Sequence, residues 1–289
     1  MTQRLPNYLK RPIIDTEKTR TIRKILKTKC LNTVCDGARC PNKSECYSKN
    51  TATFLIMGNV CTRNCRYCNI TTAHPEPLDL NEPKHVAEAI NELDLKYAVI
   101  TSVTRDDLVD GGASHFKNCI DEIRKISNTK IEILTPDFKA KKDALDIIIK
   151  AHPEVFNHNI ETVEALFKKA RPQGDYWKSI QVLKYIKENS DIITKSGFMV
   201  GLGESFNEIE KTLCDLKEVN VDIITIGQYI QPSKEHLSVE KYYTLDEFES
   251  LINLAKKIGF KNYQIAPLVR SSYKAALSWQ NALKSQTSA

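Results

Sequence analysis

The chain has 289 residues, of which 27% are charged, 41% hydrophobic and 8% aromatic, and its net charge is +6. This composition excludes disordered, collagen-like and low-complexity classes, and the length allows a sizeable core in one large domain or two small ones. No segment approaches the roughly 18 apolar residues that a membrane span needs, and no secretory signal is expected. Nine cysteines, an odd number, argue against a complete disulfide framework, so we expect reduced thiols and a cytoplasmic location.

The positive charge is concentrated at the beginning of the chain. Residues 1–30 hold nine Lys and Arg against two acidic residues, whereas the remainder of the chain is close to neutral. A basic arm of this kind can attract nucleic acid, an anionic membrane or an acidic protein, or it can be a solvated helix. The sequence leaves these interpretations open.

The first fifty residues contain one predicted helix and one segment without a core of its own. A helix is predicted over residues 16–29 because apolar residues recur on one face. Residues 30–50 contain four cysteines and almost no aliphatic side chains. Such a segment cannot bury enough apolar surface by itself, so we expect a metal to hold it.

From Thr53 onward, apolar runs alternate with helical patterns. Strands are predicted over Thr53–Met57, Tyr97–Val103, Lys130–Leu134, Glu154–Ile160, Lys195–Val200 and Asp222–Ile226. Helices are predicted near residues 84–93, 114–126, 140–150, 162–169, 176–188, 205–219 and 245–258. Repeated strand–helix units indicate a parallel sheet with right-handed crossovers.

Six such units are fewer than the eight that close a TIM barrel. We therefore predict an α/β fold with a partial (β/α)6 TIM-type barrel, and a doubly wound sheet is the alternative. The predicted domains are an N-terminal extension over residues 1–50, with the basic arm and a cysteine-rich loop, and the barrel over residues 51–289. The C-terminal segment is expected to close over the site. Polar loops follow many strands, and because ligands gather at the carboxyl ends of parallel strands, these loops are expected to share one site.

The strongest chemical signal is Cys61-Thr-Arg-Asn-Cys65-Arg-Tyr-Cys68, directly after the first predicted barrel strand. Three thiols cannot complete a four-coordinate zinc site. They can hold three irons of a [4Fe–4S] cluster and leave the fourth iron open to a small chelating molecule. The alternative is a zinc knuckle with a distant fourth ligand.

A second group of thiols lies upstream, where Cys35, Cys40 and Cys46 are separated by four and five residues. Cys30 is also four residues before Cys35, so spacing alone permits either Cys30/Cys35/Cys40 or Cys35/Cys40/Cys46 as a triad. In both cases a fourth metal corner needs another ligand.

These residues resemble a known family. Cys61-x3-Cys65-x2-Cys68 is similar to the radical S-adenosylmethionine (SAM) signature, and together with Cys35-x4-Cys40-x5-Cys46 it resembles the lipoyl synthase family over about residues 34–275. Small departures from the family pattern occur at Asp36-Gly37, Tyr47 and Ala266. The further motifs that carry the resemblance are Thr-Ala-Thr-Phe at 51–54, Arg-Asp-Asp-Leu at 105–108, Asp-Gly-Gly-Ala at 110–113, Asn-His-Asn at 157–159, Glu-Thr-Val at 161–163, Arg-Pro-Gln-Gly-Asp-Tyr at 171–176, Gly-Leu-Gly-Glu at 201–204, Thr-Ile-Gly-Gln-Tyr at 225–229, Gln-Pro-Ser at 231–233 and Arg-Ser-Ser-Tyr at 270–273.

The resemblance implies two [4Fe–4S] clusters with separate ligand sets. The first, which binds SAM, is held by Cys61, Cys65 and Cys68. The auxiliary cluster is held by Cys35, Cys40, Cys46 and Ser272. Cys61, Cys65, Cys68 and Ser272 are the implied catalytic set.

The remaining cysteines and the cosubstrate contacts are assigned more coarsely. Cys30 then has no metal role, and Cys119 and Cys214 are expected to be small buried hydrophobic residues. Among the histidines, only His158 is expected near the site, and Arg105, Asp106 and Asp107 are interpreted as loop scaffolding. The predicted SAM contacts are Tyr67, Asn159, Glu161 and Arg171.

The resemblance also implies the reaction and its partners. The family inserts sulfur at C6 and C8 of a protein-bound octanoyl chain: radicals derived from SAM remove hydrogen, and the auxiliary cluster is consumed as sulfur donor. Implied partners are octanoylated lipoyl-carrier domains (2-oxoacid dehydrogenase E2 or glycine-cleavage H protein), a ferredoxin- or flavodoxin-like electron donor and an Fe–S cluster repair protein. No nucleic acid and no membrane are expected as partners, and the basic arm is interpreted as steering an acidic carrier domain.

Two alternatives come from different sequence features. A biotin-synthase-like enzyme would use the same SAM signature, but the upstream triad and Ser272 argue against it. A non-catalytic iron–sulfur or zinc sensor would explain the basic arm, but it would not need six strand–helix units. An iron count separates these, because two clusters require about eight irons per chain.

Overall fold

The computed structural model describes residues 4–12, 14–38, 40–49 and 51–287, which form two compact units. The N-terminal unit consists of Arg11–Arg63 and Asn69–Phe156. The C-terminal unit consists of residues 4–10, 64–68 and 157–287. The cysteine loop Cys61–Cys68 therefore belongs to both, because the chain passes from one unit to the other after Arg63 and returns after Cys68. Among the described residues, every helix is too short or too polar to span a bilayer.

Four neighbouring strands form the sheet of the N-terminal unit, in the order β1-β2-β5-β6. β1 runs antiparallel to β2, whereas β2, β5 and β6 are parallel. The register places Thr53 opposite Val99 and Tyr97 opposite Lys130. The bounds are β1 (Asn32–Thr33), β2 (Thr53–Ile56), β5 (Tyr97–Ser102) and β6 (Lys130–Leu134).

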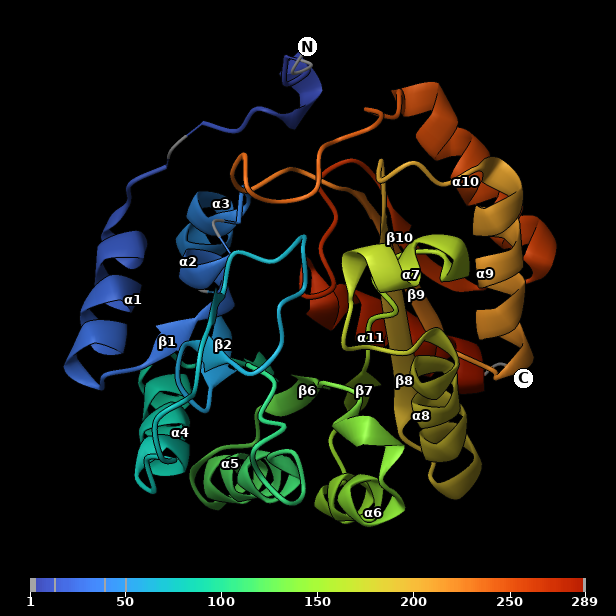
Figure 1. Cartoon of the computed structure of the whole chain (residues 1–289). Coiled ribbons are helices and arrows are strands. Elements are labelled where there is room, and N and C mark those ends of the chain that lie inside the picture. Colours follow the sequence, from blue (N-terminus) through green and yellow to red (C-terminus); the bar gives the residue numbers. More distant parts are fainter. Residues whose placement is uncertain (1–3, 13, 39, 50, 288–289) are drawn as a thin grey trace. The chain divides into compact units, whose positions relative to one another are not determined.

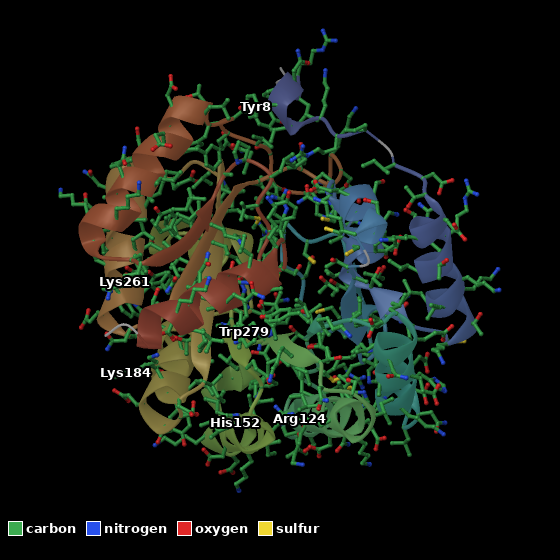
Figure 2. All side chains as sticks on the ribbon, turned by 180° about the vertical axis from the view of Figure 1, so that it is seen from behind. Tyr8, Arg124, His152, Lys184, Lys261 and Trp279 are labelled. Carbon is green, nitrogen blue, oxygen red and sulfur yellow. The ribbon has the colours of Figure 1, made fainter. Side chains whose placement is uncertain are left out.

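The crossover helices of this unit lie side by side, α4 against α5 and α5 against α6 (Figure 1). α5 buries the predicted apolar stripe, which includes Phe116 and Cys119, but its last residue Ile126 is 47% exposed. Arg124 on α5 donates hydrogen bonds to the carbonyls of Ala151 and His152 at the end of α6, which ties the two helices together (Figure 2). The bounds are α1 (Glu17–Thr28), α4 (Glu82–Glu92), α5 (Ala113–Ile126) and α6 (Lys142–Ala151).

This unit also contains several short elements, three of which hold Cys35, Cys46 and Cys61. They are α2 (Val34–Gly37), α3 (Lys43–Ser48), β3 (Val60–Cys61) and β4 (Thr71–Thr72), with the 3-10 turn η2 (Phe138–Ala140) after β6. β7 (Val155–Asn157) lies at the point of the sequence where the chain enters the C-terminal unit.

The C-terminal unit contains three neighbouring parallel strands in the order β8-β9-β10. Nearly every residue of β8 and β9 is buried, as expected for strands covered on both faces. α8 packs against β8, and α10 and α11 pack against β10 (Figure 1). The bounds are η1 (Asn7–Leu9), α7 (Glu164–Ala170), α8 (Tyr176–Asn189), β8 (Ile193–Val200), α9 (Phe206–Glu218), β9 (Ile223–Gln228), α10 (Leu245–Ile258), β10 (Asn262–Ile265) and α11 (Ala275–Thr287).

The six strands and the helices predicted from periodicity are confirmed, with ends that differ by a few residues. β10 and α11 were not predicted, since Asn-Tyr-Gln-Ile has no apolar run and α11 has only a weak amphipathic pattern. The expectation that Cys214 is buried was wrong. Cys214 is exposed on α9. Each residue of an α-helix is rotated by about 100° from the one before it, so Cys214 points away from the buried face that contains Leu213 and Leu216.

Gly227 in β9 tests how tightly the segment after β10 packs. A Cβ atom at this position would stand 2.1 Å from the backbone carbonyl oxygen of Val269, which cannot move aside as a side chain can. We expect Gly227→Ala to reduce the free energy of unfolding by about 1–3 kcal/mol. Urea unfolding of the variant and parent measures this difference, and equal midpoints would contradict the close approach.

Candidate functional site

Cys61 ends the short strand β3, and backbone groups of the N-terminal unit surround its sulfur. The N–H groups of Arg63 and Thr104 donate to Cys61 Sγ at 3.4 and 3.3 Å. Its carbonyl accepts the N–H of Ala73 at 3.2 Å, which continues the pairing of β3 with β4. Two backbone N–H groups therefore point at the sulfur atom that would bind iron as a thiolate.

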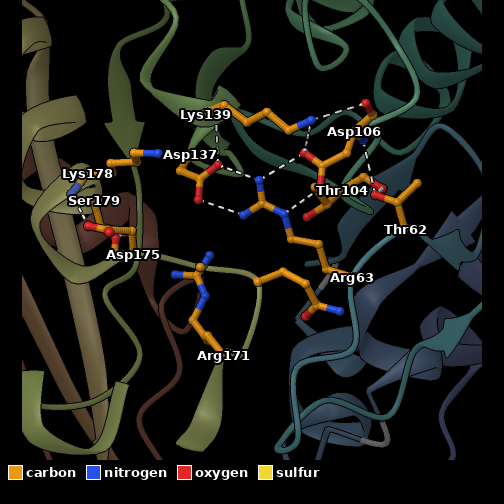
Figure 3. A network of polar contacts seen from close by, with 12 residues as sticks. Thr62, Arg63, Thr104, Asp106, Asp137, Lys139, Arg171, Asp175, Lys178 and Ser179 are labelled. Atoms are coloured by element: carbon orange, nitrogen blue, oxygen red, sulfur yellow. Dashed lines mark hydrogen bonds and ion pairs between the residues drawn. The ribbon is translucent and has the colours of Figure 1, made fainter. Parts of the chain in front are cut away.

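Arg63 is the centre of a buried ionic network in the same unit (Figure 3). Its guanidinium forms a two-point contact with Asp106 (2.7 and 2.9 Å) and another with Asp137 (2.6 and 2.7 Å). The Arg63 side chain is 4% exposed and that of Asp137 is 3% exposed. Lys139 adds a second cation, with its Nζ 3.5 Å from Asp106 Oδ1. Two carboxylates therefore face two cations, so the charge of the network is balanced.

Ionisation of Asp106 depends on this arrangement. Burial by itself raises the pKa of Asp106, but hydrogen bonds and charge from Arg63 outweigh burial, so the pKa lies below its usual value. The expectation that Arg105, Asp106 and Asp107 form a scaffold is confirmed: Asp106 binds Arg63, and Arg105 pairs with Asp107 at 2.7 Å. Arg63 and Asp137 were not predicted, although a charged residue inside a cysteine loop was a visible signal.

The other part of the cysteine loop, residues 64–68, is held within the C-terminal unit. The N–H of Cys68 donates to the carbonyl of Cys65 at 3.0 Å, which makes a tight turn. Arg66 connects this turn to α7 and to the segment after β9, because its N–H donates to Ala170 and its carbonyl accepts from Leu237. His236 was expected to lie away from the site, but its Nε2 is 2.9 Å from the carbonyl oxygen of Cys68.

Tyr67 lies among the polar residues that follow β7. Desolvation raises the pKa of Tyr67 well above its usual value, and the neighbouring Cys65 and Glu161 raise it further, whereas Arg171 opposes them. Burial likewise raises the pKa of Glu161, against the charge of Arg171 and hydrogen bonds from Asn159 and Tyr67. The structure thus brings together Tyr67, Asn159, Glu161 and Arg171, all within the C-terminal unit.

The backbone of Glu161 is fixed by β8. Its N–H donates to Gly197 and its carbonyl accepts from Met199, at 3.1 and 2.9 Å, and its φ of 69° lies in the left-handed region. A non-glycine residue holds such a conformation only when its surroundings enforce it. The Oδ1 atom of Asn159 is buried and has no hydrogen-bond partner among the described residues, so it remains ready to accept a ligand donor.

The upstream cysteines come together in the N-terminal unit. The N–H of Cys40 donates to the carbonyl of Cys35, and the N–H of Cys46 donates to Asn42 at the start of α3. Burial raises the pKa of Cys35 to about 12, and the neighbouring Cys40 and Cys46 contribute. Burial followed by the charge of Cys40 also raises the pKa of Cys46 to about 12. Cys30, by contrast, is exposed.

Two departures from the family pattern meet beside these thiols. The hydroxyl of Tyr47 donates to Asp36 Oδ2 at 2.8 Å, and Lys43 pairs with the other oxygen at 2.8 Å. Thr33 donates to the same carboxylate at 2.7 Å. Burial by itself raises the pKa of Asp36, but these hydrogen bonds outweigh burial, so the pKa of Asp36 lies below its usual value. The network joins α2, which contains Cys35, to α3, which contains Cys46, and Cys40 lies between the two helices.

Ser272 follows β10 in the C-terminal unit, in a turn closed by the N–H of Tyr273 on the carbonyl of Arg270 at 2.8 Å. Its neighbour Ser271 accepts a hydrogen bond from Asn159 at 2.6 Å. The Arg-Ser-Ser-Tyr segment therefore contacts the polar group around Glu161. The role of Ser272 as a ligand stays a prediction.

Among the described residues, no three His, Cys, Asp or Glu side chains converge as the ligands of a single metal ion do. The thiolates of a four-iron cubane bind separate irons at its corners, so they stand farther apart than the ligands of one zinc ion. All nine cysteines are free thiols.

Comparison with known proteins gives matches to both sequence and fold. Residues 55–216 match the model of the Radical SAM superfamily. The chain is 48% identical to "Lipoyl synthase" of Caldanaerobacter subterraneus subsp. tengcongensis over 276 residues, which are 95% of this chain and 97% of the relative. It is 50% identical to "Lipoyl synthase" of Hahella chejuensis over 275 residues, 94% of this chain and 83% of the relative.

A solved structure shares the fold at low sequence identity. HydG, a maturase of the [FeFe]-hydrogenase, superposes with a TM-score of 0.58 at 15% identity, covering 94% of this chain and 71% of that one. This likeness supports the predicted α/β class with mostly parallel strands and alternating helices.

Replacing Arg63 tests the buried network. Arg63→Met leaves two carboxylates without their shared cation, so we expect a loss of about 3–5 kcal/mol in the free energy of unfolding at neutral pH. Because Arg63 lowers the pKa of Asp106, the stabilisation is complete at neutral pH and is lost as the pH falls through the native-state pKa of Asp106. Urea unfolding at several pH values should therefore show parent and variant converging on acidification, and a constant difference would contradict it.

Proposed function

Because this chain belongs to the lipoyl synthase family of the radical SAM superfamily, we propose that it inserts two sulfur atoms at C6 and C8 of a protein-bound octanoyl chain to form a lipoyl group. The observation that carries the proposal is a full-length match to lipoyl synthases in a chain with two separate cysteine triads. Neither a biotin-synthase-like enzyme nor a non-catalytic sensor is favoured by this match.

Cys61, Cys65 and Cys68 would hold the first cluster. The two N–H groups on Cys61 Sγ fit an anionic sulfur ligand, and the turn at Cys65–Cys68 places two further thiols close together in the chain. A cluster held by these three thiols would supply the one-electron chemistry that converts SAM into a radical able to remove hydrogen from an unactivated carbon. No side chain could deprotonate such a carbon. The residues of this chain therefore bind and orient the substrates and exclude water from the site.

Tyr67, Asn159, Glu161 and Arg171 would bind SAM. The unpartnered Oδ1 of Asn159 and the carboxylate of Glu161 can accept hydrogen bonds from ribose hydroxyls or from the ammonium group of the methionine moiety. The guanidinium of Arg171, buried against the ring of Phe167, can pair with the methionine carboxylate.

Cys35, Cys40, Cys46 and Ser272 would hold the auxiliary cluster, which is the sulfur-donating substrate. Burial raises the pKa of Cys35 and Cys46 to about 12, so iron must displace the protons of these two thiols when it binds. Serine oxygen is a harder ligand than thiolate, and a less firmly held corner suits a cluster that must be taken apart.

The proposed partners are an octanoylated lipoyl-carrier domain, a ferredoxin- or flavodoxin-like electron donor and an Fe–S cluster repair protein, all in the cytoplasm. Charge supports an acidic carrier. Helix α1 buries Ile22, Ile25 and Leu26, and its outer face exposes Lys18, Arg20, Arg23, Lys24 and Lys27. The helix thus has one face packed against the protein and one exposed basic face, and the basic face supports the proposal of an acidic carrier.

The central experiment is anaerobic incubation of the reconstituted protein with SAM, a reductant and an octanoylated peptide. Mass spectrometry should detect replacement of two hydrogens by two sulfurs. About eight irons per chain are expected on loading. Formation of 5′-deoxyadenosine without any sulfur in the peptide, in a chain that carries both clusters, would contradict the proposed reaction.

Removing ligands of the auxiliary cluster should separate sulfur insertion from the cleavage of SAM. Cys40→Ala and Ser272→Ala are expected to abolish sulfur insertion while 5′-deoxyadenosine still forms, because the first cluster has its own ligands. Cys30→Ala is the matched control, since Cys30 is exposed and outside both proposed ligand sets, and it should insert sulfur normally. Full sulfur insertion by Cys40→Ala would remove the auxiliary role from this triad.

Reversing the charge of α1 tests carrier recognition. We expect Lys18→Glu/Lys24→Glu/Lys27→Glu to raise KM for an octanoylated carrier domain about tenfold at low salt, and the effect should fade as salt screens the charges. Turnover of a short octanoylated peptide is the control and should stay unchanged. A KM for the carrier with the same salt dependence in variant and parent would show that the arm does not steer it.

A further inference from the structure

Three stretches of the N-terminal unit that are distant in sequence meet at the residues following Cys61. Thr62 donates from its N–H (3.1 Å) and from its hydroxyl (2.9 Å) to the carbonyl of Thr104, and the hydroxyl accepts the N–H of Asp106 at 3.0 Å. The side chain of Arg63 then joins Asp106 to Asp137 (Figure 3). Residues 61–63 are thereby fastened to residues 104–106 along both backbone and side chains.

The turn that holds Asp137 is itself strained. Phe138, Lys139 and Ala140 all have φ between 45° and 56°, in the left-handed region. Left-handed backbone costs non-glycine residues about 1–2 kcal/mol each, so neighbouring contacts must enforce it. Asp137 supplies two such contacts, accepting the N–H of Lys139 at 2.9 Å and the guanidinium of Arg63. Its carboxylate is therefore a fixed point for Arg63.

These contacts hold two backbone N–H donors in place at the sulfur atom of Cys61. The N–H groups of Arg63 and Thr104 both reach Cys61 Sγ, and each belongs to a residue that the network clamps. Hydrogen bonds to ligand sulfur and the charge nearby are among the factors that set the reduction potential of an iron–sulfur cluster. Reduction adds negative charge, so the two backbone N–H donors on the sulfur favour the reduced state.

We propose that the Thr62–Arg63–Asp106–Asp137 network sets the reduction potential of the cluster that Cys61 holds, by keeping two backbone N–H groups on its sulfur. Thr62 and Arg63 are positioning residues in this device, since each acts through the backbone rather than on a substrate. The inference rests on the proposed function only in that Cys61 is a cluster ligand. The inference requires no octanoyl substrate, so it can be tested independently of the proposed sulfur insertion.

The cleanest variant changes no charge. Thr62→Val removes the hydroxyl that bridges Thr104 and Asp106, whereas Thr62→Ser keeps it, so the two form a matched pair. Arg63→Lys keeps the positive charge but cannot form two-point contacts with two carboxylates. If the N–H donors move away from Cys61, the reduced cluster loses stabilisation, and the potential becomes more negative.

The measurement is an anaerobic redox titration of the reconstituted full chain, followed by electron paramagnetic resonance. The signal that changes on adding SAM identifies the cluster with the open iron. For Thr62→Val and Arg63→Lys we expect at least a tenfold lower ratio of reduced to oxidised cluster at a fixed solution potential, which is about 59 mV for one electron. Thr62→Ser should titrate like the parent.

The iron content of the variants distinguishes an effect on the reduction potential of the cluster from an effect on the structure of the cysteine loop. The proposal requires that Thr62→Val load iron like the parent and titrate at a lower potential. An unchanged potential in Thr62→Val and Arg63→Lys would overturn it. So would loss of iron from Thr62→Val with normal loading of Thr62→Ser, because the hydroxyl would then hold the loop together rather than tune the cluster. If the variants show the expected shift in potential but the parent protein does not insert sulfur, the result contradicts the proposed function and leaves the present inference standing.

Discussion

The interaction on which the N-terminal half of the site depends is the pairing of one buried guanidinium with two carboxylates. Arg63 lies in the cysteine loop, Asp106 follows β5 and Asp137 follows β6, so one side chain joins three loops at strand ends. A buried cation left alone would be costly, and so would either carboxylate without it. The three charges are therefore stable only together, and this mutual requirement fixes the backbone beside Cys61.

The cysteine-rich segment is organised by a different constraint. It has too few apolar side chains for a core, yet Cys35 and Tyr47 are buried. Hydrogen bonds from Tyr47, Thr33 and Lys43 to Asp36 connect its two short helices. Burial raises the pKa of Cys35 and Cys46 to about 12. A polar network therefore positions the two short helices, and two buried thiols lie beside it.

In the C-terminal unit, strain and burial converge on Glu161. Its left-handed backbone is enforced by β8, and its carboxylate lies beside Arg171 and the hydroxyl of Tyr67. The same unit also holds the turn from Cys65 to Cys68, through Arg66 and His236.

Periodicity in the sequence predicted six strands and the longer helices up to α10, because burial on one face imposes a repeat on the sequence, but it missed α11. The cysteine spacings indicated iron–sulfur ligands, but they left Cys30/Cys35/Cys40 and Cys35/Cys40/Cys46 equally possible, and only the family resemblance chose between these triads. The sequence did not predict β10, Arg63, Asp137 or His236, and it misplaced Cys214. Each of these depends on partners distant in the chain: a weakly apolar strand is stabilised by its neighbour, and a buried charge by its counter-ion. Only the tertiary structure brings such partners together, so only it could decide which polar residues support the cysteines.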